Sequence, residues 1–243
     1  MIKEIFQDIR IILLKGDIEG NQESFKLKLK KTMLILVVSF LVAMFLMLFI
    51  HLSLLKMNIS IENQVDKFIS LRGIVLSAFF FILVGPIMEE FVFRASLRYS
   101  CSNMVLMGVG ISYFGVRNHD FASCFPWMNN TIFMIIVILS FSLFIFLLLK
   151  CFKNISSRLS VFWLRNPKLI FYLSVIVFGF IHFLNFRLGV KYLFLMPLLT
   201  LPQTMYGIVL GYSRMKFGIQ YSIFLHVATN LLFFSPRLLT YVI

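Results

Sequence analysis

The sequence predicts an all-α protein, a polytopic bundle of transmembrane helices. Three observations lead to this fold class: 60% of the 243 residues are hydrophobic, only 14% are charged, and the mean hydropathy is +0.94. A soluble domain carries roughly 25% charged residues, and a chain of this length cannot hide so much apolar surface from water. A bilayer can cover that surface, because one helical span needs about 20 mostly apolar residues.

The chain divides into a short polar start and one long apolar remainder. Acids and bases are interleaved over 1–31, which predicts an amphipathic helix lying on the cytoplasmic surface of the membrane. No linker interrupts 32–243, so we expect a single membrane-embedded domain there. Its apolar runs predict about seven spans, with eight as the alternative. The runs are 32–55, 73–93, 104–116, 131–149, 169–186, 193–212 and 221–235.

The basic residues predict the orientation. If all seven runs cross, 16 Lys and Arg residues lie on the side of the N-terminus and seven lie on the other side. Basic loops stay in the cytoplasm, so the N-terminus is expected inside and the C-terminus outside. The net charge of +13 therefore indicates membrane orientation, and we expect no nucleic acid partner although such a charge would suggest one in a soluble protein.

Two acids lie inside an apolar run, Glu89 and Glu90 in FILVGPIMEEFVFRASL. A charge at membrane depth costs a few kcal/mol or more and commonly marks a functional site. Glu90 and Arg94 are four residues apart and can pair on one helix face, whereas Glu89 points about 100° away. Pro86 can kink the helix just before the carboxylates. The structural alternative is a Glu90–Arg94 pair that only stabilises the bundle.

Two of the four histidines are also embedded, His182 in FGFIHFLNF and His226 in SIFLHVATNLLFF. Phe178 lies four residues before His182, and Asn230 lies four residues after His226, so each shares a helix face with its histidine. An isolated embedded histidine is more often a hydrogen-bonded structural residue. Together with the paired acids, the two histidines form a candidate constellation.

At these residues the sequence resembles the CAAX-protease and bacteriocin-processing (CPBP, or Abi) intramembrane endopeptidases, which include the type II CAAX prenyl endopeptidases. The family motifs E-E-x-x-x-R, F-x-x-x-H and H-x-x-x-N read here as Glu89–Arg94, Phe178–His182 and His226–Asn230. The resemblance covers about 73–100 and 169–235. Between them, about 101–168 is expected to be an inserted helical pair with a basic loop.

The resemblance implies peptide-bond hydrolysis with five catalytic residues, Glu89, Glu90, His182, His226 and Asn230, supported by Arg94 and Phe178. Glu89 would activate water with help from His182, Glu90 and Arg94 would fix the helix and the local charge, and His226 with Asn230 would stabilise the oxyanion. Glu89, His182 and His226 would alternatively be ligands of a catalytic zinc. The usual H-E-x-x-H signature is missing, so we favour a metal-free mechanism.

Two further classes remain open. The first is a non-catalytic membrane protein of the immunity or chaperone kind on the same fold. The second is a small transporter, since embedded acids and histidines also mark ion paths. We favour the peptidase and expect a peptide or protein substrate at the lipid bilayer. The richness in Phe, Ile, Leu, Lys and Asn suggests an AT-rich genome, so we expect a multi-pass protein of a bacterial plasma membrane.

Overall fold

Every regular element in the described part of the chain is helical. The computed structural model describes all residues except 21, 60–63, 117–128, 187–189 and 243. The elements are α1 (Ile2–Lys15), α2 (Phe25–Lys56), α3 (Gln64–Arg72), α4 (Ile74–Ala78), the π-helix η1 (Phe79–Val84), α5 (Gly85–Phe93), η2 (Ala95–Leu97), α6 (Cys101–Val116), α7 (Asn130–Cys151), α8 (Lys153–Arg165), α9 (Pro167–Ile181), η4 (His182–Asn185), η5 (Val190–Leu195), α10 (Met196–Leu199), α11 (Leu201–Lys216) and α12 (Ile219–Val242).

The predicted membrane spans correspond to helices. Among the described residues, six helical segments are long and apolar enough to cross a bilayer: Phe25–Lys56, Ile74–Leu97, Asn130–Cys151, Pro167–Asn185, Tyr192–Lys216 and Ile219–Thr240. The run at 104–116 lies in α6, an apolar helix of 16 residues that is short for a full span. The predicted all-α membrane fold is therefore confirmed, with a number of spans near seven.

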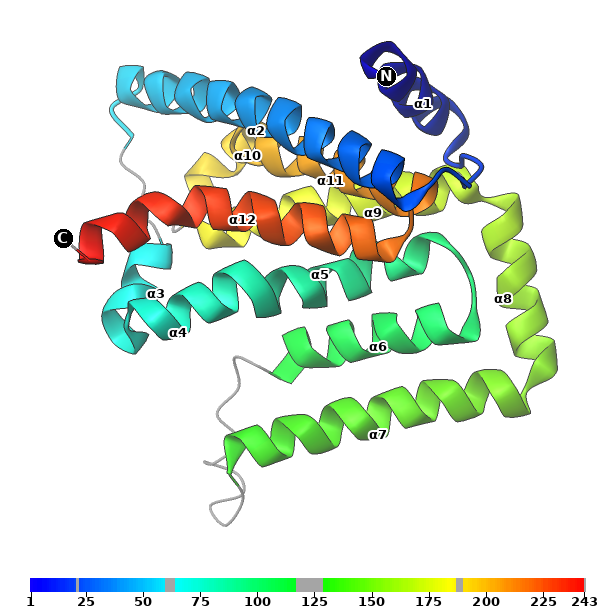
Figure 1. The fold of residues 1–243 in the computed structure, drawn as a ribbon. Coiled ribbons are helices and arrows are strands. Elements are labelled where there is room, and N and C mark those ends of the chain that lie inside the picture. The colour runs from blue at the N-terminus through cyan, green and yellow to red at the C-terminus, as the bar shows by residue number, and fades with distance from the viewer. Residues whose placement is uncertain (21, 60–63, 117–128, 187–189, 243) are drawn as a thin grey trace.

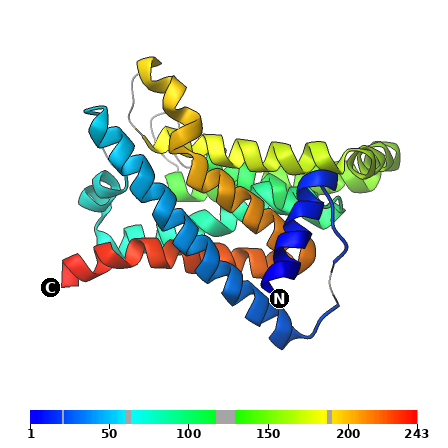
Figure 2. The ribbon, with the colours of Figure 1, turned by 90° about the horizontal axis from the view of Figure 1, so that it is seen from above.

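Successive apolar helices run in alternating directions. Figure 1 shows α2, α12, α5, α9 and α11 gathered in one bundle, with α6 and α7 lying beside α5 at its lower edge. The basic segment after α7 forms α8, which runs across the end of the bundle to reach α9. Figure 2 shows α2 crossing over the bundle from above.

The N-terminal helix α1 is tied to the ends of α9 and α11. Its Asp8 carboxylate lies 3.1 Å from Lys216 Nζ and accepts a hydrogen bond from the Tyr212 hydroxyl. Tyr172 donates a further hydrogen bond to the Leu13 carbonyl. Ile12 is fully buried on the same face. The helix therefore covers one end of the bundle through polar contacts as well as apolar ones.

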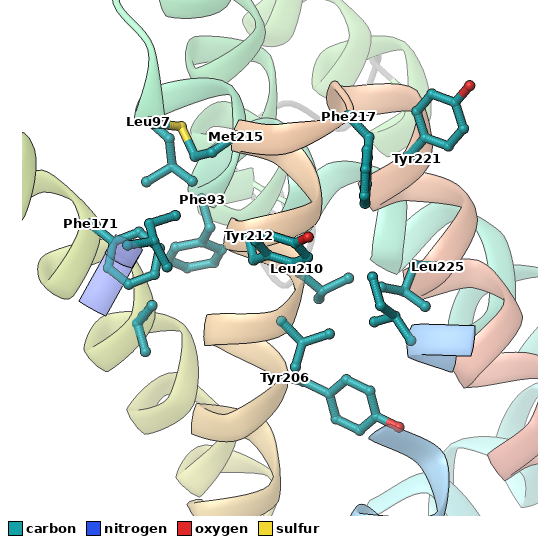
Figure 3. Packing of buried hydrophobic residues seen from close by; sticks show 14 of the residues in the cluster. Phe93, Leu97, Phe171, Tyr206, Leu210, Tyr212, Met215, Phe217, Tyr221 and Leu225 are labelled. Carbon is teal, nitrogen blue, oxygen red and sulfur yellow. The ribbon is translucent and has the colours of Figure 1, made fainter. Parts of the chain in front are cut away.

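The hydrophobic core lies where α9, α11 and α12 meet α5. Phe171, Leu210, Tyr212 and Leu225 are almost completely buried there, as Figure 3 shows from close by. Helices α9 and α11 approach closely because glycine occupies the contact: a Cβ on Gly211 would lie 2.9 Å from the Phe171 ring. Small residues at such crossings allow tight packing between helices inside a membrane. Helix α9 also packs against α5 through the rings of Phe178 and Phe93, whose centroids are 5.4 Å apart.

Candidate active site

A π-turn precedes the two glutamates. Residues Phe79–Val84 form a π-helix, and the Gly85 N–H donates to the Phe80 carbonyl five residues before it. The next residue, Pro86, has no N–H to donate, and its ring would meet the carbonyl four residues earlier in a regular helix. The chain therefore widens by one residue here, as π-turns at functional sites commonly do. After this turn, α5 carries Glu89 and Glu90.

The two adjacent glutamates face different surroundings. The Glu90 side chain is fully buried, whereas 21% of the Glu89 side chain is exposed. The difference follows from their separation by about 100° around the helix. Only Glu89 is open to an incoming molecule.

Glu90 binds groups from two helices. Its Oε1 lies 2.9 Å from His226 Nδ1 and 3.5 Å from Arg94 Nε, and its Oε2 accepts a short hydrogen bond from the Ser222 hydroxyl. His226 and Ser222 are four residues apart and share one face of α12. Glu90 thus links α5 to α12 through polar contacts.

Glu89 lies between the two embedded histidines. Its Oε2 is 3.8 Å from His182 Nε2 and 3.6 Å from His226 Nε2. His182 follows the last residue of α9 and begins η4, so its ring projects from the end of that helix. The three side chains come from α5, α9 and α12, and they are brought together although Glu89 and His182 are 93 positions apart in the sequence.

The hydrogen-bond partners assign the histidine tautomers. His182 Nδ1 lies 2.7 Å from the Phe178 carbonyl oxygen, which can only accept, so Nδ1 carries the hydrogen. His226 Nδ1 faces the Glu90 carboxylate, which likewise accepts. Both rings therefore direct Nε2 toward Glu89, as an acceptor when the ring is neutral and as a donor when it is protonated.

The buried Arg94 side chain contacts an aromatic ring as well as the Glu90 carboxylate. Its guanidinium carbon lies 4.0 Å from the centroid of the Phe178 ring, and its Nη1 and Nη2 have no hydrogen-bond partner among the described residues. Phe178 also contacts both histidine rings, with centroids 4.8 Å from His182 and 5.9 Å from His226. The Phe178 side chain therefore packs against three members of the constellation at once.

Other helices hold the far end of α5. Ser174 donates to the Phe93 carbonyl at 2.6 Å, and Arg214 Nε donates to the Arg94 carbonyl at 3.1 Å. The last carbonyls of a helix have no partner within the helix. Side chains from α9 and α11 satisfy two of them here, so the position of the glutamates is fixed relative to both helices.

Asn230 contacts the π-turn. Its Nδ2 donates to the Phe81 carbonyl at 2.9 Å. Among the described residues, no hydrogen bond joins Asn230 to either glutamate, so Asn230 is less directly connected to the carboxylates than His226.

The same side chains include residue types that can bind a metal. Two histidines with anchored Nδ1 atoms and a carboxylate are suitable ligand types for zinc. Among the residues with described positions, however, no group of three or more His, Cys, Asp or Glu side chains is arranged to hold a metal ion.

Sequence reasoning missed one polar member of this cluster. Ser222 is fully buried and binds Glu90, but a serine in an apolar helix usually satisfies itself on a nearby carbonyl and so gives no signal. Its position four residues before His226, in the pattern S-x-x-x-H-x-x-x-N, could have indicated that Ser222 shares a helix face with His226 and Asn230. The structure groups Ser222, His226 and Asn230 along α12.

The fold and the cluster define a class of protein, a multi-pass integral membrane protein with embedded glutamates and histidines facing one another. A family model described as "Type II CAAX prenyl endopeptidase Rce1-like" matches residues 71–232, which include all five predicted site residues. The chain belongs to this family, as the motifs predicted, and is in general terms an intramembrane peptidase. Neither the curated proteins nor the solved structures compared with it include a match.

Proposed function

We propose that the chain is a glutamate-dependent intramembrane endopeptidase of a bacterial plasma membrane, which cleaves a peptide substrate at the bilayer. The observation that carries this proposal is the position of the Glu89 carboxylate within 4 Å of Nε2 of both His182 and His226. These distances are longer than direct hydrogen bonds and suit groups that share one water molecule. Glu89 is also the more exposed of the two glutamates.

In the proposed reaction, Glu89 takes a proton from a water molecule that His182 Nε2 also orients. The water oxygen attacks the carbonyl carbon of the scissile peptide bond and forms a tetrahedral oxyanion. Glu89 then passes the proton to the leaving nitrogen as the C–N bond breaks. The products are a carboxylic acid and an amine, so one water is consumed for each bond cleaved.

His226 is the side chain best supported as oxyanion donor. Since Glu90 accepts from its Nδ1, a protonated His226 presents Nε2–H toward the water held by Glu89. The Glu90 carboxylate holds the His226 ring in this orientation. Glu90 and Arg94 therefore act through His226 and the helix. The family resemblance implies a similar role for Asn230, whose amide nitrogen is bound to the Phe81 carbonyl in this structure.

The test is cleavage of membrane peptides. Membranes containing the wild-type protein and the Glu89→Gln variant would be compared by mass spectrometry for new peptide termini. Glu19→Gln, which changes an exposed carboxylate outside the cluster, is the matched control. We expect termini that appear with the wild type and with Glu19→Gln and disappear with Glu89→Gln. Full biological activity of Glu89→Gln would favour the non-catalytic immunity or chaperone function.

A further inference from the structure

The Phe81 carbonyl has no backbone donor. In a regular helix its partner would be the N–H of Gly85, but that N–H is given to Phe80. In the π register its partner would be the N–H five residues ahead, and residue 86 is a proline. A carbonyl without a partner inside a membrane protein costs free energy. A side chain must supply the missing hydrogen bond.

Asn230 supplies it from another helix. Its Nδ2 lies 2.9 Å from the Phe81 oxygen in a partly buried contact between α12 and η1. The rings of Phe81 and Phe234 stack beside it at a centroid separation of 6.1 Å. Phe234 lies one turn after Asn230 on α12, so two residues of that helix contact the same residue of the π-turn. The contact joins the helix that carries His226 to the turn that precedes the glutamates.

The width of this turn sets where the glutamates point. One residue corresponds to about 100° of rotation around an α-helix. If the segment 79–84 returned to the regular helical register, everything after it would rotate by about that angle relative to the preceding turn. Glu89 would then leave the two Nε2 atoms, and Glu90 would leave His226 and Ser222.

We propose that Asn230 is a positioning residue, which holds the π-turn by replacing the hydrogen bond that Pro86 cannot make. This role rests on the proposed function, because the positions that it fixes are those of Glu89 and Glu90. It differs from a role as oxyanion donor, in which the amide would contact the reacting carbonyl. The two roles can be separated by a substitution at residue 86 that restores the backbone N–H that proline lacks.

The decisive variant is Asn230→Ala combined with Pro86→Ala. Alanine at 86 has an N–H that can reach the Phe81 carbonyl in the π register, so the double variant regains the bond that Asn230→Ala loses. We expect Asn230→Ala alone to lower kcat about 100-fold with little change in KM, the loss typical of a misplaced catalytic group. The double variant should recover most of this kcat. Pro86→Ala alone keeps Asn230 and should turn over close to the wild-type rate.

A matched control removes a bond of the same type elsewhere. Asn103 Nδ2 donates to the Arg98 carbonyl at 2.7 Å, away from the cluster, and Asn103→Ala should leave kcat unchanged. Thermal stability in detergent would be measured for every variant. If the double variant recovers stability without kcat, Asn230 contacts the reacting carbonyl and the positioning role is wrong. A double variant that recovers neither thermal stability nor kcat would also overturn the positioning role. An active Glu89→Gln would instead overturn the proposed function.

Discussion

His226 Nδ1 lies 2.9 Å from Glu90 Oε1, and this contact joins the second glutamate of α5 to the histidine of α12. Because Nδ1 is used in this bond, only Nε2 of His226 remains for chemistry. The same Glu90 carboxylate faces Arg94 and Ser222. One buried acid therefore orients the histidine, neutralises an arginine and connects two helices.

Glu89→Gln should remove turnover while leaving the fold intact. Glutamine keeps the shape of the side chain but cannot take the proton from water. General acid–base catalysis contributes about 10²–10⁴-fold, so kcat should fall by at least that factor. The measurement is peptide cleavage by purified protein in detergent, with thermal unfolding as the check on folding. An active but unstable Glu89→Gln, together with a folded but inert Glu90→Gln, would show that the roles of the two glutamates are exchanged.

Glu90→Gln should damage the fold as well as the activity. It would leave the buried Arg94 guanidinium without its counter-charge, and removal of one partner from a buried ion pair costs about 3–5 kcal/mol. Glu90 is fully buried, so solvent cannot compensate. The expected result is a lower unfolding temperature or a lower yield than for Glu89→Gln. A folded, thermally stable and inert Glu90→Gln would contradict this assignment.

Ser222→Ala should lower the stability of the protein by about the contribution of one hydrogen bond. A hydrogen bond to a charged group contributes about 1.5–3 kcal/mol, and Ser222 donates to the Glu90 carboxylate. We expect a stability loss of that size and a partial loss of kcat. Ser142→Ala is the control, because the Ser142 hydroxyl donates to the Ile138 carbonyl within α7, away from the cluster. Equal effects of the two substitutions would show that Ser222 has no special connection to the site.

The metal-free mechanism predicts resistance to chelators. Purified enzyme should keep its activity in a strong chelator and should contain no stoichiometric zinc by elemental analysis. Loss of activity that zinc alone restores would make Glu89, His182 and His226 metal ligands. The buried Glu90 would then act on the orientation of one ligand.

Orientation in the membrane is also testable. The excess of basic residues on one side predicts a cytoplasmic N-terminus and an external C-terminus. Reporter fusions at the N-terminus should be active only in the cytoplasm, and fusions after residue 243 only outside. A cytoplasmic signal from both ends would show that one of the seven runs, most readily the short α6, does not cross.

The sequence predicted the helices well because the physical signal is local. Each apolar run lies within a helical segment to within one residue, since a backbone inside a bilayer must satisfy its own hydrogen bonds. The embedded polar residues were equally visible, because Glu89 and His226 stand out in apolar surroundings. The motif spacing also indicated the pairing of Glu90 with Arg94, which the 3.5 Å ion pair matches.

Contacts between helices could not be predicted in the same way. Nothing in the spacing indicates that Glu90 binds His226 and Ser222, because that depends on the register of α12 against α5. The role of Pro86 was expected only as a kink, whereas the structure has a π-turn whose free carbonyl binds Asn230. Aromatic packing was also hidden: Phe178 was expected beside His182, and it covers Arg94 as well.

The distribution of the cluster over α5, α9 and α12 has a consequence for biosynthesis. Because α12 is translated after the other helices, a nascent chain already inserted as far as α11 has both glutamates but lacks Ser222, His226 and Asn230. The proposed hydrolytic centre therefore cannot exist during most of membrane insertion. A protease built in this order has no hydrolytic centre to act on neighbouring proteins until α12 has entered the bilayer.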